Sequence, residues 1–388
     1  MTPLLIAALC CVTWVYLLAA RGGFWRAAER DGVVAETSPE PVSWPRVVAV
    51  VPARDEAEVV GESLGSLLHE DYRGDFVIVV VDDHSFDGTA AVARNAAAAA
   101  GASDRVIVLA APTLPDEWTG KLWALHHGVR HTCSSTEQPD YMLFTDADIR
   151  HDVDTLTQLV LRAVRDRTVL TSLMAKLRCE TLAERAMIPA FIFFFQMLYP
   201  FAWVNRADRR TAAAAGGCML VHRQTLQAAG GIEAIRDELI DDCALARLLK
   251  RHGPIWLGLT ERVRSLRTYR SLREIRRMIT RSAYAQLGFS PWWLAFTTLA
   301  MAVTYLAPPA LTLLGSGVSQ FLGALAWAQM TLAFQPTLRL YRLAPWWGLA
   351  LPAIAGLYLI FTLESAWQHV RGTGGEWKGR VHWPVSRR

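Results

Sequence analysis

Three stretches without a single charged residue limit what this chain can fold into. Residues 282–338 contain no Asp, Glu, Lys or Arg, and neither do residues 1–20 or 343–363. A helix needs about 20 mostly apolar residues to cross roughly 30 Å of hydrocarbon, and each stretch meets that length. Between Arg21 and Arg281 the composition is that of an ordinary globular protein. The sequence therefore predicts a soluble domain held between membrane segments.

The first stretch is predicted to be an uncleaved anchor. Its first residues are uncharged and Arg21 and Arg26 follow the apolar run, whereas a cleaved signal peptide, the alternative, begins with a basic region. Because Lys and Arg mark the cytoplasmic side, the globular domain is expected in the cytoplasm. Later spans are predicted at 291–314, 319–338 and 345–363. Three of them would put the basic tail outside, so one segment is re-entrant or interfacial, or the tail breaks the rule.

Composition argues against two classes of site. The net charge of +4 is modest and no basic groove studded with aromatic residues is visible, so no nucleic-acid partner is expected. The six cysteines are scattered, without the paired spacing of a metal site.

Between the uncharged stretches, strand patterns alternate with helix patterns. Strands are predicted at Val47–Val51, Phe76–Val81, 105–111 and 141–145. Continuous apolar runs are typical of parallel strands buried on both faces, and alternation with helices favours an α/β doubly wound, mostly parallel sheet. Ligands of such a sheet bind beyond the carboxyl ends of its strands, so the site is expected at that edge.

Two carboxylates close the fourth predicted strand. Asp146 and Asp148 follow the apolar run one residue apart. Unpaired buried charge is costly, whereas a hard divalent cation prefers oxygen ligands. Two surface aspartates in a loop are the alternative. The position directly after an apolar strand favours the metal site.

Four motifs in a fixed order resemble those of the family 2 glycosyltransferases, the inverting group with a GT-A fold. They are "VVVDDHSFDGT", "GKLWAL", "FTDAD" and "DELIDDCALARLL", within residues 47–253. The membrane segments and "DEWTGKLWALHHG" look like those of the bacterial hopene-associated glycosyltransferases. The resemblance implies a hexosyltransferase in the bacterial inner membrane that takes a sugar from a nucleotide-sugar, by family habit a UDP-sugar. The acceptor it suggests is a lipid of the bilayer, a hopanoid or another polyisoprenoid.

The resemblance also implies roles for residues at the strand ends. The donor would be bound by Pro52, Ala53, Arg54, Glu56, Asp82, Asp83, Lys121 and Asp146. Carboxylates suit the base and ribose because N–H and O–H groups donate to them, and Lys121 would approach the phosphates as a point charge. Asp146 and Asp148 would hold Mg²⁺ or Mn²⁺.

On the acceptor side, the resemblance points to the paired aspartates that open a predicted helix. Asp242 would be the general base, with Asp241 beside it, although acidic residues at a helix start also favour the helix dipole. Gly216 and Gly217 would lie beside the acceptor. Of the Q-x-x-R-W signature of processive members only Arg281 remains, in "MITRS", so a single transfer is expected.

Two further segments are expected at the membrane. Residues 187–204 are uncharged and aromatic, but as a span they would separate Asp146 from Asp242 across the bilayer. They are predicted to form an interfacial helix or a hydrophobic wall for a lipid acceptor. Residues 271–281 place leucine and isoleucine on one face and arginines on the others, which predicts an interfacial helix on anionic lipid.

The predicted organisation is an anchor (1–20), a linker (21–45), a nucleotide-sugar-binding half (46–150), an acceptor-binding and catalytic half (151–270), an interfacial basic helix (271–286), transmembrane segments (287–364) and a basic tail (365–388). Two other functions stay open. One is a metal-dependent nucleotidyltransferase, which also uses paired carboxylates. The other is a non-catalytic membrane transport or assembly protein with a degenerate GT-A domain.

Overall fold

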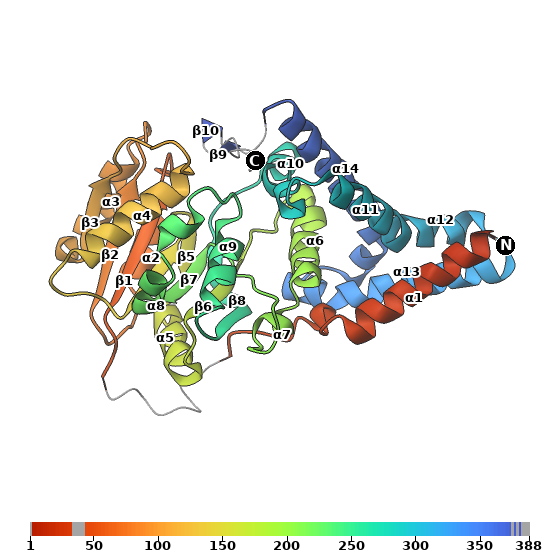
Figure 1. The fold of residues 1–388 in the computed structure, drawn as a ribbon, viewed down its shortest axis with the longest axis horizontal. Helices are drawn as coiled ribbons and strands as arrows, with labels where there is room; N and C mark the ends of the chain where they lie inside the picture. Colours follow the sequence, from red (N-terminus) through yellow and green to blue (C-terminus); the bar gives the residue numbers. More distant parts are fainter. Residues whose placement is uncertain (1, 33–42, 374–375, 378–379, 382–388) are drawn as a thin grey trace. The chain divides into compact units, whose positions relative to one another are not determined.

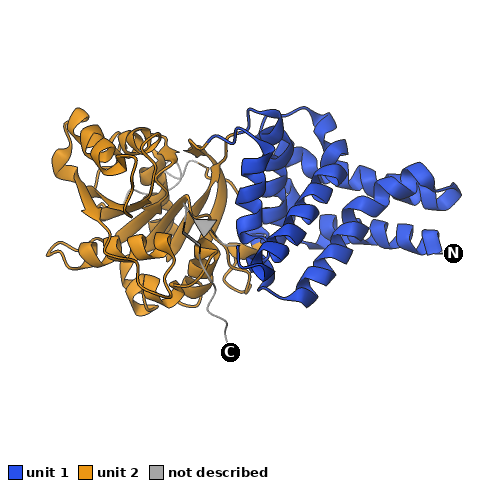
Figure 2. Ribbon diagram, turned by 90° about the horizontal axis from the view of Figure 1, so that it is seen from above, with its two compact units in different colours: residues 1–28, 179–202, 268–376 blue, residues 29–178, 203–267, 377–388 orange. Residues whose placement is uncertain are grey.

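The computed structural model describes residues 2–32, 43–373, 376–377 and 380–381. The chain divides into two compact units, shown in Figure 2. The first, of apolar helices, comprises residues 1–28, 179–202 and 268–376, and the second, an α/β unit, comprises residues 29–178, 203–267 and 377–388. The predicted linker and basic tail fall partly outside the described residues.

The α/β unit is built on an eight-stranded sheet with the order β3-β2-β1-β4-β7-β6-β8-β5 (Figure 1). The strands are β1 (Val47–Ala53), β2 (Phe76–Asp82), β3 (Val106–Ala110), β4 (Tyr141–Thr145), β5 (Ile149–His151), β6 (Leu170–Lys176), β7 (Cys218–His222) and β8 (Ile255–Ser265). Strands β1 to β4 are parallel and β6 is parallel to β8, whereas β7 is antiparallel to both its neighbours and β5 is antiparallel to β8. The four predicted strands and the mostly parallel α/β sheet are confirmed.

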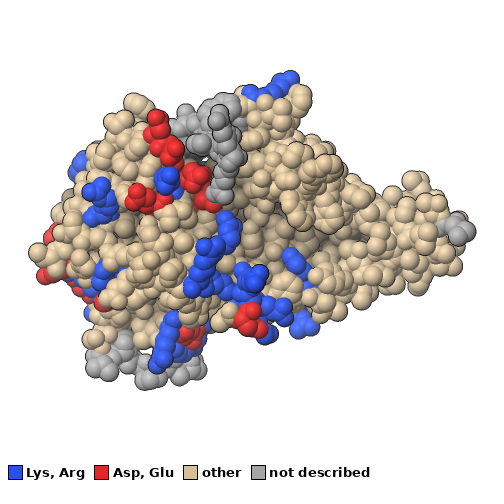
Figure 3. Space-filling view, in the orientation of Figure 1, with Lys and Arg blue, Asp and Glu red and all other residues tan. Residues whose placement is uncertain are grey.

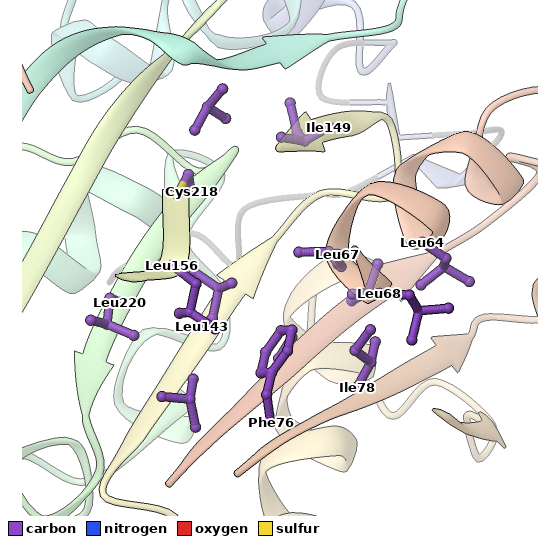
Figure 4. Close-up of a cluster of buried hydrophobic side chains, with 14 of the residues drawn as sticks. Leu64, Leu67, Leu68, Phe76, Ile78, Leu143, Ile149, Leu156, Cys218 and Leu220 are labelled. Carbon is purple, nitrogen blue, oxygen red and sulfur yellow. The ribbon is translucent and has the colours of Figure 1, made fainter. Parts of the chain in front are cut away.

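Helices cover both faces of this sheet. They are α2 (Val60–Leu68), α3 (Thr89–Ala99), α4 (Gly120–Cys133), α5 (Thr155–Asp166), α8 (Arg223–Ala228) and α9 (Asp241–Leu249), and the short α7 (Phe201–Val204) lies where the two units meet in sequence. Strand β1 is buried along its whole length, as its apolar run predicts. Its alternate residues Val47 and Val51 join one core with Leu64 of α2 and Leu156 of α5, part of which is shown in Figure 4.

On the opposite face, α4 lies very close to the sheet. A Cβ added at Gly128 would be 2.4 Å from Cγ1 of Val50 and 3.0 Å from Cγ2 of Val81, so only glycine allows this approach. Thr119 caps the helix, since its side chain accepts a hydrogen bond from the Leu122 N–H. Close packing and this cap fix the start of α4 beside the carboxyl ends of β1 and β2.

The helical unit contains α1 (Thr2–Ala20), α6 (Leu182–Leu198), α10 (Leu272–Ser282), α11 (Pro291–Met301), α12 (Ala307–Leu314), α13 (Gly317–Leu340) and α14 (Leu351–Val370). Helix α1 is held to the segment around Thr304 by Trp14, whose indole N–H donates a hydrogen bond to the Thr304 carbonyl at 2.8 Å. Its other face leaves Leu5, Leu9 and Val12 more than half exposed. On the face shown in Figure 3, the described surface near the N-terminal end of α1 carries no charged side chain.

Four helical segments in the described part of the chain are long and apolar enough to cross a membrane: Thr2–Ala20, Leu182–Val204, Pro291–Leu314 and Pro345–Val370. Three of them match predicted spans. The predicted span 319–338 is helical but is not among the four, because glutamines interrupt its apolar sequence. Leu182–Val204 is among them, although its sequence predicts an interfacial helix or a hydrophobic wall for a lipid acceptor.

Helix α10 differs from its prediction as an interfacial helix with an apolar face on lipid. Ile275 is 0% exposed and Ile279 6%, so the isoleucine part of that face is buried in the protein, whereas Leu272 is 40% exposed. Arg276 forms an ion pair with Glu364 of α14 at 3.1 Å. The sequence shows an amphipathic pattern but not its partner, which is protein along this face.

Candidate active site

One lysine joins the end of β4 to the start of α9. The Lys121 Nζ atom lies 2.9 Å from Oδ1 of Asp146 and 3.0 Å from Oδ2 of Asp241. Asp146 follows β4 and Asp241 opens α9, almost a hundred residues later. The predicted convergence of the two acidic motifs is therefore present, and Lys121 stands between them.

Asp242, the predicted general base, is held by two backbone N–H groups. Its Oδ2 accepts from Gly216 at 3.0 Å and its Oδ1 from Cys243 at 2.7 Å. Burial and the neighbouring Asp241 raise the pKa of Asp242 to about 6, against the opposing effects of Lys121 and the two N–H groups. A carboxylate with such a pKa is matched to proton transfer near neutral pH. The helix-capping alternative holds only for the contact with Cys243.

Negative charge exceeds positive charge around Lys121. Burial raises the pKa of Asp146, Lys121 lowers it, and the nearby carboxylates of Asp148 and Asp241 raise it further. Burial opposes the charged form of Lys121, but the carboxylates outweigh it and the pKa of the lysine is raised. The side chain of Asp146 remains about one third exposed, at 34%, so a ligand can reach it. The site has an unbalanced negative charge that a cation would neutralise.

Asp148 lies next to Asp146 but has different partners. Its Oδ2 atom is 3.3 Å from the Nε of Arg267, and the Ser265 hydroxyl donates to the same oxygen at 3.3 Å. Arg267 also lies 3.1 Å from Glu56, so one guanidinium links the ends of β1 and β8 to the acidic turn. The sequence alone does not point to Arg267 or Ser265. Several arginines follow β8, and only the fold shows that Arg267 is the one beside Asp148.

The residues predicted for the nucleotide lie at the ends of β1 and β2. Pro52 and Ala53 are buried in β1, and Arg54 donates to the Asp83 carbonyl. Asp83 is 0% exposed, with its carboxylate 3.8 Å from Arg54. Asp82 is partly exposed and accepts a hydrogen bond from Ser85. Of the two aspartates, Asp82 is the one accessible to a ligand as the protein stands.

Gly216 borders the site so closely that even a methyl group there would push the Lys121 amine aside by a few tenths of an ångström. An added Cβ would lie 3.2 Å from Nζ of Lys121 and 3.6 Å from Oδ2 of Asp242. At Gly217 the corresponding Cβ would be 3.1 Å from Cδ1 of Ile149. Arg281 belongs to α10 of the other unit, and its acceptor-side role stays a prediction.

The carboxylates could hold a metal only together with other ligands. Within the described ranges, no three His, Cys, Asp or Glu side chains are placed to hold a metal ion. Asp146 and Asp148 offer carboxylate oxygens, the ligands of hard divalent cations, in surroundings of excess negative charge. The donor set fits a cation that takes its remaining ligands from water and a phosphate.

Comparison with known proteins relates the middle of the chain to one family. Residues 48–229 match the model of the family described as Glycosyl transferase family 2. The match spans a little under half of the chain. No curated protein matches the sequence. The hopene-associated group stays a prediction.

A solved structure agrees with the GT-A fold. Mannosyltransferase PcManGT from Pyrobaculum calidifontis, solved with GDP-Man and Mn²⁺, is similar over 93% of this chain and 99% of its own, with a TM-score of 0.59 and 20% identity. At that identity the likeness concerns the fold alone.

Glucosyl-3-phosphoglycerate synthase from Mycobacterium tuberculosis, with Mn²⁺, UDP-glucose and phosphoglyceric acid, has 19% identity and a TM-score of 0.40, over 63% of this chain and 79% of its own. Mannosyl-3-phosphoglycerate synthase from Rubrobacter xylanophilus has 19% identity and a TM-score of 0.40, over 68% and 82%. These two scores are too low to compare folds.

Proposed function

We propose that this protein is a membrane-bound, inverting glycosyltransferase that makes a single transfer of a sugar from a nucleotide-sugar to a lipid. The observation that carries the proposal is the meeting of Asp146, Lys121 and the Asp241–Asp242 pair around one point. Sugar transfer needs charge control at the leaving diphosphate and a base at the acceptor. These residues can supply both within one site.

Lys121, Asp146 and Asp148 form the donor side of the proposed site. Lys121 would contact the diphosphate, and the two aspartates would hold Mg²⁺ or Mn²⁺. When bound there, the ion neutralises negative charge on the leaving nucleotide as a Lewis acid. A similar fold has been solved with GDP-Man, so the proposal commits to a nucleoside diphosphate sugar and favours UDP-sugars only by family habit.

Asp242 is the proposed base. Its carboxylate takes the proton from the acceptor hydroxyl while that oxygen forms a bond to the anomeric carbon. The bond between the anomeric carbon and the diphosphate oxygen breaks on the opposite face, and the anomeric configuration inverts. The N–H groups of Gly216 and Cys243 orient the carboxylate for this step.

A lipid acceptor is supported by the apolar helices of this chain. Four helical segments could cross a membrane, and exposed apolar side chains line α1. We infer a location in the bacterial inner membrane, with the α/β unit in the cytoplasm and a hopanoid or another polyisoprenoid as acceptor. The absence of a Q-x-x-R-W sequence supports one transfer rather than polymer synthesis.

The test uses the full chain in detergent or lipid nanodiscs, extracted bacterial lipid, Mn²⁺ and nucleotide-sugars labelled in the sugar, in the α-phosphate or in the β-phosphate. Sugar label in the lipid without either phosphate label supports the proposal. Label from the α-phosphate in the lipid supports a nucleotidyltransferase, and label from the β-phosphate together with the sugar supports a phosphosugar transferase. No label in lipid with any donor, while the protein remains folded, would favour a non-catalytic membrane protein.

A further inference from the structure

Two ionisable side chains lie buried behind the proposed site, and the reaction above does not use them. Glu70 follows α2 and His151 ends β5, and both side chains are 0% exposed. Oε1 of Glu70 and Nδ1 of His151 face each other at 4.0 Å. Neither atom has a hydrogen-bond partner among the described residues. Burying two such groups is costly unless they share a proton or a specific role.

The hydrogen-bond directions around His151 are determined by Thr145. The Thr145 hydroxyl donates its single hydrogen to the Gly217 carbonyl at 2.8 Å. It lies 3.0 Å from Nε2 of His151 and must therefore accept from that nitrogen. Nε2 then carries the imidazole hydrogen, and Nδ1 presents its lone pair to Glu70.

Glu70 complements this arrangement. Its Oε2 accepts from the Leu156 N–H at 3.0 Å, which leaves Oε1 to carry a proton toward His151. Burial raises the pKa of Glu70 to about 9; the Leu156 N–H opposes this, and the nearby carboxylates of Asp71, Asp154 and Asp152 raise it further. Burial lowers the pKa of His151 to about 3.

At neutral pH both groups of the pair are therefore uncharged. The thiol of Cys218 is a further titratable group near Glu70, and its pKa is raised mainly by burial. Cys218 is thus a neutral thiol as well.

We propose that Glu70 and His151 are positioning residues for the transfer reaction; this inference rests on the proposed function. Thr145 ends β4 directly before Asp146, and Gly217 directly follows Gly216, whose N–H binds the proposed base. The chain from Glu70 through His151 and Thr145 to Gly217 therefore fixes the donor-side strand end against the turn that holds the base. The pair acts on the rate of transfer through this spacing and touches neither substrate.

The main test removes the central hydroxyl. We expect Thr145→Val to lower kcat about tenfold, because one hydrogen bond on each side is lost, with KM changed less than threefold. Thr145→Ser keeps the hydroxyl and restores kcat. Thr171→Val is the matched control, since Thr171 is also 0% exposed and its hydroxyl bonds Thr168 in the same sheet, away from the site. Equal kcat values for the two valine variants would mean that the residues from Glu70 to Gly217 have only a structural role, and would overturn the inference.

A second readout does not depend on catalysis. Amide hydrogen exchange in the segment 212–218 is expected to be faster in Thr145→Val than in Thr171→Val. Equal exchange in the two variants would overturn the inference, even if the wild-type protein transfers no sugar. Absence of transfer by the wild type is instead a failure of the proposed function.

Glu70 tests the neutral state of the pair. In Glu70→Gln the side-chain amide can present an N–H to Nδ1 of His151 and still accept from the Leu156 N–H, so this variant should keep at least half of the wild-type kcat. Glu70→Leu offers neither group, and its kcat should fall about tenfold. Equal losses in both variants would contradict a neutral pair in which Glu70 presents a proton to His151.

Discussion

Replacing Asp242 with Asn should make the protein's stability less sensitive to pH. The pKa of this carboxyl is raised from 3.8 to about 6 by burial and by Asp241. Each pKa unit corresponds to about 1.4 kcal/mol, so the ionised side chain lowers the free energy of unfolding by about 3 kcal/mol above pH 6. Because the pKa is higher in the folded state, this destabilisation is absent below pH 4 and develops as the pH rises from 4 through 6.

The amide variant cannot ionise, but it loses one contact. Asp242 accepts from two backbone N–H groups, whereas Asn offers one oxygen, so the substitution costs roughly 1–3 kcal/mol at every pH. Because this cost is the same at every pH, it does not affect how the stability difference between variant and wild type changes with pH. The stability of the variant relative to wild type should therefore improve by about 3 kcal/mol between pH 4 and pH 8.

Thermal unfolding of the full chain in detergent, followed by tryptophan fluorescence at both pH values, measures this difference. About 3 kcal/mol corresponds to a relative shift in Tm of roughly 6–12 °C for a unit of 150–250 residues. A difference in Tm between variant and wild type that is the same at pH 4 and pH 8 would refute the reasoning.

Further expectations concern the same site. In wild type, kcat/KM for transfer should rise with pH to a plateau above about 6, as Asp242 loses its proton; a profile flat from pH 4.5 to 8 would argue against this base. Gly216→Ala should lower kcat about tenfold, because its Cβ displaces Lys121, whereas Gly65→Ala, whose Cβ has open space in α2, should leave kcat unchanged in the same assay. Lys121→Met should weaken nucleoside diphosphate binding about tenfold or more by calorimetry, and Lys176→Met, which removes an ion-pair lysine of β6, should not; equal affinities would contradict a phosphate contact at Lys121.

The first half of the fold follows from its sequence because burial dominates there. The strands β1, β2 and β4 are nearly continuous apolar runs, and a parallel sheet buried on both faces requires such runs. The second half is harder to predict. Strand β5 has only three residues and β7 pairs antiparallel to β4 and β6, so their place depends on tertiary partners rather than on local pattern.

The site was predictable where a carboxylate follows an apolar run. Asp146 could be recognised by that position, and Asp242 only by its resemblance to a family motif. Arg267 could not be recognised from the sequence, because its role comes from the fold, which brings the end of β8 beside Asp148. His151 could not be predicted for a similar reason, since a single histidine in a short strand gives no sign that a buried glutamate faces it.

The most direct test of the account separates donor binding from transfer in one pair of variants. Asp146→Asn should weaken binding of the nucleotide-sugar with Mn²⁺ about tenfold or more. Asp242→Asn should bind the same donor within about threefold of wild type but transfer sugar to lipid at least about a hundredfold more slowly. A D242N protein that still glycosylates lipid at the wild-type rate would contradict the central claim.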